Sequence, residues 1–143
     1  TALERMRSAD LILHAGDLME RSVLEELQAL GPPVEAIHGN ADSAELKALL
    51  PAARLIDADG VMIAMTHNGG PADGRLGRMR KRFPEADAVV FGHSHIPLHE
   101  TDADGFQIFN PGSATDRRRM PNHTIGVARA QDGRVTFELV TLD

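Results

Sequence analysis

The chain has 143 residues, of which 42% are hydrophobic and 25% charged, with a net charge of −6 and no cysteine. This composition favours one globular domain over residues 1–143, and it excludes a low-complexity chain and a disulfide framework. The acidic balance and the lack of Tyr and Trp argue against a long nucleic-acid partner, and the absence of a long apolar stretch or an export signal predicts a cytoplasmic protein without membrane contact.

The first half of the sequence alternates between helix and strand patterns. Thr1 and Glu4 form a capping box that opens a short helix. Gly31-Pro32-Pro33 ends a second helix, Asp42 or Ser43 caps a third, and Asp59-Gly60 predicts a hairpin turn. Strands are expected at 10–14, 34–37, 53–56 and 61–65, and the apolar helical repeats are Val23, Leu24, Leu27 and Leu30, then Leu46, Leu49 and Leu50.

The second half changes to strands joined by turns. A basic helix is expected at 75–83 and a strand at 86–91. Four further strands, at 98–101, 106–109, 124–130 and 135–142, follow with Asp/Gly turns between them. Parallel βαβ units followed by an antiparallel meander predict an α/β (α+β) fold with two packed sheets flanked by helices.

Five polar residues each come just after the C-terminal end of an apolar strand, namely Asp17, Asn40, His67, His93 and His95. Ligand sites of open α/β sheets form at that edge. Each residue alone has a structural explanation, because Asp and Asn form turns and a lone His is more often packed than a ligand. Five at one edge favour a metal site, and imidazole nitrogens with hard oxygen donors suit Mn, Fe, Zn or Ni.

The motifs around these residues occur in the order Gly16-Asp17, Gly39-Asn40-Ala41-Asp42, Thr66-His67, Gly92-His93-Ser94-His95 and Asn110-Pro111-Gly112-Ser113. They resemble the motifs of calcineurin-like metallophosphoesterases, above all the small single-domain phosphodiesterases of bacterial and archaeal type. The resemblance implies a four-layer αββα sandwich of two mixed β-sheets flanked by helices. It also implies hydrolysis of small phosphate esters, phosphodiesters more than monoesters, by attack of a metal-bound hydroxide.

The resemblance implies a binuclear site with two divalent ions, Mn²⁺ first and Zn²⁺, Fe²⁺, Ni²⁺ or Mg²⁺ as the other candidates. Asp17 would bridge the ions, Asn40, His67 and His93 would complete one site, and His95 would bind the second ion. The family adds an Asp and a His from an Asp-x-His motif on its first strand, and this sequence has no such strand. We expect residues upstream of Thr1 in the natural chain to supply it.

Three further residues bear on the substrate. Ala41 stands where many phosphatases of the family carry a His that acts as general acid, so proton donation to the leaving group has no assigned residue. Asn68, like Asn40, is a candidate substrate contact, with a turn beside Gly69 and Gly70 as the alternative. Arg117, in a run of three arginines, could bind a phosphate from the rim, with a solvated loop as the alternative.

Two histidines, His14 and His38, lie beside the motifs and could orient metal ligands or simply pack. Two functions stay open at this level. The first is the metal-dependent phosphoesterase, acting on a small substrate as a monomer or small homo-oligomer. The alternative is a catalytically silent protein-interaction scaffold, similar to the related subunit of the retromer coat. The incomplete second metal site favours this alternative. The presence of all five ligands favours the enzyme.

Overall fold

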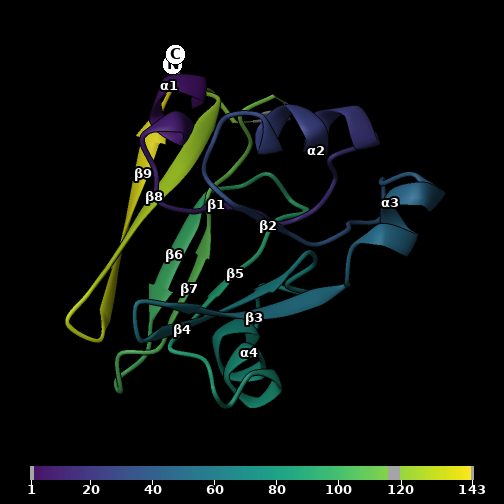
Figure 1. Cartoon of the computed structure of the whole chain (residues 1–143). Coiled ribbons are helices and arrows are strands. Elements are labelled where there is room, and N and C mark those ends of the chain that lie inside the picture. The colour runs from purple at the N-terminus through teal and green to yellow at the C-terminus, as the bar shows by residue number, and fades with distance from the viewer. Residues whose placement is uncertain (1, 116–119, 143) are drawn as a thin grey trace.

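The computed structural model describes residues 2–115 and 120–142 (Figure 1). The helices are α1 (Ala2–Arg7), α2 (Arg21–Gln28), α3 (Ala44–Leu49) and α4 (Arg75–Arg82). The strands are β1 (Ile12–His14), β2 (Val34–Ala36), β3 (Ala53–Ala58), β4 (Val61–Thr66), β5 (Ala88–Val90), β6 (Leu98–Thr101), β7 (Gln107–Asn110), β8 (Thr124–Gln131) and β9 (Arg134–Thr141). Every strand expected from the sequence is therefore present.

Local signals account for several element ends. Ser43, rather than Asp42, caps α3, because its Oγ accepts a hydrogen bond from Leu46 N at 3.3 Å. The β3–β4 hairpin turns at Asp59 and Gly60, whose φ angles of 53° and 87° are typical of a type I′ turn. The cap predicted at Thr1 lies outside the described residues. Within the described ranges, no helix is long and apolar enough to cross a membrane.

The strands form a five-stranded sheet in the order β3-β4-β5-β7-β6, a parallel pair β1-β2 and an antiparallel hairpin β8-β9. The expected antiparallel meander is wrong at β7, which pairs parallel with β5 and antiparallel with β6. Ile108 and Phe109 explain this position, since neighbouring residues on a strand face opposite sides and both are buried. A strand that is apolar on both faces is more stable inside a sheet than at its edge.

Three apolar clusters separate the layers. Between the sheets, Val61, Ile63, Ala88 and Val90 of the five-stranded sheet pack with Val135, Leu13 and Ala15. Met79 of α4 packs on the other face of that sheet, against Ala64, Val89, Phe91 and Ile108. On the far side, Leu24 and Leu27 of α2 and Leu46 of α3 pack on Leu18 and Ala36. The order helix, strand, strand, helix confirms the four-layer αββα sandwich.

An arginine connects the two strand layers. Arg54 of β3 donates from Nε to Ala36 O at 2.9 Å and pairs with Glu35 Oε2 of β2 at 2.9 Å. The parallel pairs β1-β2 and β4-β5 each bring their carboxyl ends to one edge of their sheet. The loops that follow these four strands can therefore meet.

Candidate metal centre

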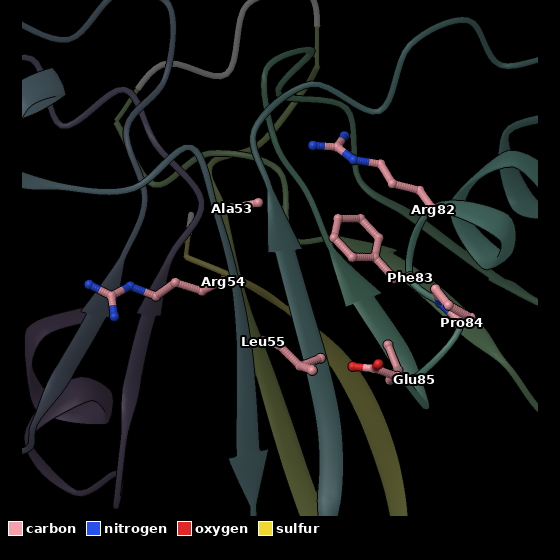
Figure 2. Close-up of a pocket in the computed structure, with 8 residues that line it drawn as sticks. Ala53, Arg54, Leu55, Arg82, Phe83, Pro84 and Glu85 are labelled. Atoms are coloured by element: carbon pink, nitrogen blue, oxygen red, sulfur yellow. The ribbon is translucent and has the colours of Figure 1, made fainter.

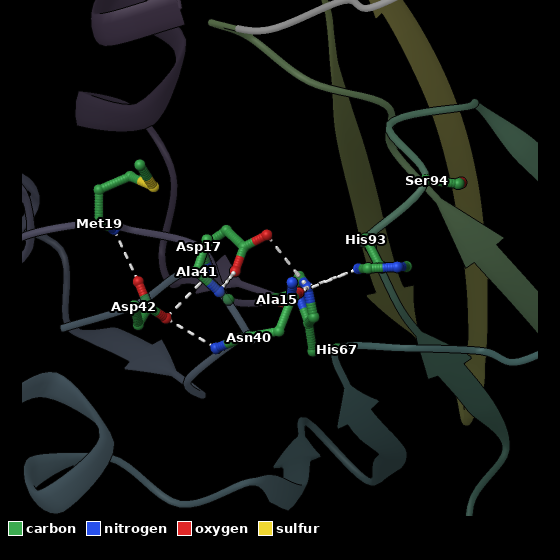
Figure 3. A network of polar contacts seen from close by, with 12 residues as sticks. Ala15, Asp17, Met19, Asn40, Ala41, Asp42, His67, His93 and Ser94 are labelled. Carbon is green, nitrogen blue, oxygen red and sulfur yellow. Dashed lines mark hydrogen bonds and ion pairs between the residues drawn. The ribbon is translucent and has the colours of Figure 1, made fainter. Parts of the chain in front are cut away.

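Four loops meet at the carboxyl ends of β1, β2, β4 and β5 (Figure 3). Each contributes one polar side chain from the predicted set: Asp17, Asn40, His67 and His93. One ligand atom from each of Asp17, His67 and His93 lies within 4.8 Å of the others. The structure thus brings together four residues that are up to 76 positions apart (93 − 17) in the sequence.

The contacts at this point are short. His67 Nε2 lies 2.9 Å from Asn40 Oδ1 and 3.2 Å from Asp17 Oδ2. His93 Nδ1 lies 3.0 Å from Asn40 Oδ1 and 3.3 Å from His67 Nε2. The amide oxygen of Asn40 is therefore shared between the two imidazole rings.

The hydrogen bonds show what kind of ligand this set fits. His67 Nδ1 lies 2.7 Å from Ala15 O, and because a carbonyl only accepts, Nδ1 carries a proton. In the neutral ring, Nε2 then presents a lone pair to two further acceptors, the oxygens of Asn40 and Asp17. Lone pairs that converge in this way bind a positive charge. Imidazole, carboxylate and amide donors together fit a divalent transition metal ion.

The loops that carry these residues contain strained backbone. Asp17, Met19, His93 and His95 have φ angles of 61°, 76°, 70° and 60°, in the left-handed region that L-residues seldom adopt. Such conformations persist only where the surroundings hold them, and they cluster at functional sites. The strain therefore supports a functional assignment of both loops.

Asp42 is the main residue that the sequence reasoning missed, since it was considered only as a helix cap. Its side chain is buried, with 5% of its surface exposed. It accepts three backbone N–H groups, from Asp17 at 3.0 Å, Met19 at 2.6 Å and Gly39 at 2.7 Å. One carboxylate thus ties the loop after β1 to the loop after β2. Its place two residues after Asn40 was the available signal.

The remaining predicted residues lie outside the cluster. His95 is not among the described residues that gather within 4.8 Å of one another, so its place on a second ion stays a prediction. Asn68 Oδ1 accepts from Gly70 N at 2.8 Å, which is the turn contact given as its alternative. Arg117 falls outside the described residues. Asp17 Oδ1 accepts from Ala41 N at 2.9 Å, so Ala41 contributes a backbone donor.

His14 supports the loop after β1. Its Nδ1 accepts from Gly16 N at 3.2 Å, which requires an unprotonated nitrogen at this position. Burial lowers the pKa of His14 from its ordinary 6.5 to about 4, and the negative charges of Asp42 and Asp17 offset only part of this effect. The folded protein therefore holds His14 neutral.

Acid is expected to destabilise the fold through His14. The unfolded chain binds a proton at a higher pH than the folded chain does, so stability is lost as the pH falls from the ordinary pKa of 6.5 toward about 4. Between about pH 7 and about pH 5, His14 is expected to cost about 2 kcal/mol of unfolding free energy. Urea unfolding at both pH values measures it. His14→Asn retains an acceptor for Gly16 N and should remove this part of the pH dependence; an unchanged dependence contradicts the assignment.

A family model for the calcineurin-like phosphoesterase superfamily domain matches residues 1–133. The chain belongs to this superfamily. A probable metallophosphoesterase of Methanothermobacter thermautotrophicus is 30% identical over 139 residues, which are 96% of this chain and 78% of the relative. The superfamily agrees with the resemblance drawn from the sequence.

Solved structures share the fold of this superfamily member. An archaeal phosphodiesterase aligns with a TM-score of 0.75 and 21% identity, covering 97% of this chain and 89% of that one. Wild-type Vps29 of Entamoeba histolytica, complexed with Zn²⁺, aligns with a TM-score of 0.76 and 20% identity, covering 99% of this chain and 88% of that one. At these identities, the likeness establishes the four-layer fold.

A groove of about 350 Å³ lies apart from the residues of the candidate metal centre, between β3 and the segment after α4 (Figure 2). Ala53, Arg54 and Leu55 line it from β3, and Phe83, Pro84 and Glu85 line it from the segment after α4. Among the residues that the structure describes, no predicted site residue lines it.

Proposed function

We propose that this chain is a divalent-metal-dependent phosphoesterase that hydrolyses small phosphate esters, phosphodiesters in preference to monoesters. The observation that carries the proposal is the convergence of Asp17, Asn40, His67 and His93 on one point. Membership of the superfamily and the fold of the archaeal phosphodiesterase support the same class of reaction. Mn²⁺ is the first candidate ion; Asp17 would be shared between two ions and His95 would bind the second.

A bound divalent ion supplies Lewis-acid chemistry, which lowers the pKa of water and neutralises charge on phosphoryl oxygens. The residues of the chain are oriented for this. Ala15 O holds the Nδ1–H of His67, so Nε2 faces the site. Ala41 N holds Asp17 Oδ1, so Oδ2 faces His67. Because the methyl group of Ala41 cannot donate a proton, esters with good leaving groups are the expected substrates.

The decisive experiment measures turnover of an aryl phosphodiester and the matching phosphomonoester by metal-free protein, with and without added Mn²⁺. We expect turnover only with the ion, and faster turnover of the diester. Asp17→Asn is the control, because its amide oxygen can still accept from Ala41 N while the charge is lost. No turnover above this control with Mn²⁺, Zn²⁺, Fe²⁺ or Ni²⁺ would contradict the proposal.

The second candidate is a protein-interaction module without turnover. The fold shared with Vps29 favours it. Because that Vps29 structure is itself a zinc complex, metal binding alone does not separate the two candidates. Tight Mn²⁺ binding by this chain with no hydrolysis of either ester would favour the interaction module.

A further inference from the structure

The loop of residues 92–96 needs an external support. It carries two left-handed histidines, His93 and His95, with φ angles of 70° and 60°. Such conformations are unfavourable for residues other than glycine, and they persist only where neighbouring groups fix them. The ring of His93 reaches Asn40 and His67 from this loop, so a change in its backbone moves a member of the metal centre.

Asn110 supplies that support from the end of β7. It is fully buried, with 0% exposure. Its Nδ2 donates to Gly92 O at 3.1 Å and to Ser94 Oγ at 3.3 Å, and its Oδ1 accepts from Gly112 N at 2.9 Å. Both hydrogens of the Asn110 amide are thus donated to the loop, one to the residue before His93 and one to the residue after it. Ser94 stands directly beside His93 (Figure 3).

The sheet explains why β7 can do this. β7 pairs in parallel with β5, with Phe109 opposite Val90, so Asn110 lies next to the start of the loop. An apolar residue at this position would satisfy the core but would remove one hydrogen-bond donor from each of Gly92 O and Ser94 Oγ. A buried amide is therefore chemically specific here.

We propose that Asn110 is a positioning residue for the metal centre, and that its amide fixes the loop 92–96 so that His93 reaches Asn40 and His67. The catalytic consequence rests on the proposed function. The structural consequence does not, because all three hydrogen bonds of Asn110 are made to groups of the protein itself. The amide of Ser94, which donates to Gly92 O at 2.9 Å, reports on the loop directly.

The first test is Asn110→Asp, which keeps the size of the side chain and replaces the two donors by an acceptor. We expect hydrogen exchange at the amide of residue 94 to accelerate at least about tenfold, because a local opening that costs 1.4 kcal/mol less is tenfold more populated. Affinity for Mn²⁺ alone, measured by calorimetry, should fall about 10- to 100-fold, as is usual when a group that orients a metal ligand is lost.

Thr124→Val is the matched control. Thr124 is also buried, and its Oγ1 donates to Pro111 O at 2.7 Å, in the segment next to Asn110 but not in the loop 92–96. It should lower the unfolding free energy while changing Mn²⁺ affinity and exchange at residue 94 by less than about twofold. An equal loss in both variants would show general destabilisation and overturn the inference.

Ser94→Ala keeps the inference testable if Asn110→Asp does not fold. It removes one of the two acceptors without placing a charge in the core, and it should accelerate exchange at residue 94 and weaken Mn²⁺ binding several-fold. Unchanged exchange and affinity in folded Asn110→Asp, or in Ser94→Ala where the former is unfolded, overturn the proposal. Failure of the wild-type protein to bind any of Mn²⁺, Zn²⁺, Fe²⁺ and Ni²⁺ would refute the proposed function, and exchange would still decide the role of Asn110.

Discussion

Replacing Asp42 by Ala is expected to lower the free energy of unfolding by about 4 kcal/mol, because three hydrogen bonds to a buried carboxylate are lost together. The N–H groups of Asp17, Met19 and Gly39 would be left without this acceptor. Water that enters the space left by the side chain limits the loss to less than the sum of three separate bonds. Since the two released loops carry Asp17 and Asn40, Mn²⁺ affinity should fall by about 100-fold.

Urea unfolding and calorimetric titration with Mn²⁺ measure these effects. Asp42→Asn should cost about half as much, since its one oxygen can still accept from Asp17 and Gly39 while its NH₂ group faces Met19 N. Asp87→Ala is the control, because Asp87 is exposed and its side chain accepts one N–H, from Met62 at 2.8 Å. If Asp42→Ala costs no more than this control, Asp42 does not hold the loops.

Replacing Gly39 by Ala is expected to reduce Mn²⁺-dependent turnover by about 100-fold, the usual effect of misplacing reacting groups by about 1 Å. A Cβ atom on Gly39 would lie 2.7 Å from Asp17 N and 2.8 Å from His67 Cε1, and it would also overlap Asp17 Oδ1. These distances are shorter than van der Waals contact, so Asp17 or His67 must move. Gly16, whose φ is 99°, packs against Gly39 N, so the two loops touch at these two glycines.

Gly77→Ala provides the control for this substitution. Gly77 lies inside α4, and a Cβ atom there meets nothing within 4 Å. It should stabilise the fold by about 0.5–1 kcal/mol through helix propensity and leave turnover within about twofold of wild type. If Gly39→Ala keeps the turnover and stability of the wild type, the close contact between the two loops is not required for the site, and the prediction is wrong.

The sequence was most informative where the determinants are local. Hydrophobic periodicity and turn residues depend on neighbours within a few positions, so they located the strands and helices, including the Asp59-Gly60 turn and the Ser43 cap. The rule that ligands gather at the carboxyl ends of parallel strands then selected Asp17, Asn40, His67, His93 and His95, of which the structure places the first four together. The assignment of these residues as metal ligands remains our proposal.

Only the tertiary structure decided the features that depend on distant pairing. The support of His67 by Ala15 spans 52 positions, and the contact of Asp42 with Asp17 N spans 25. A local sequence pattern cannot predict such contacts, because the packing of the layers determines which backbone groups a buried side chain meets. For the same reason the sequence placed β7 in a meander, whereas burial on both faces placed it between β5 and β6 and brought Asn110 to the loop 92–96.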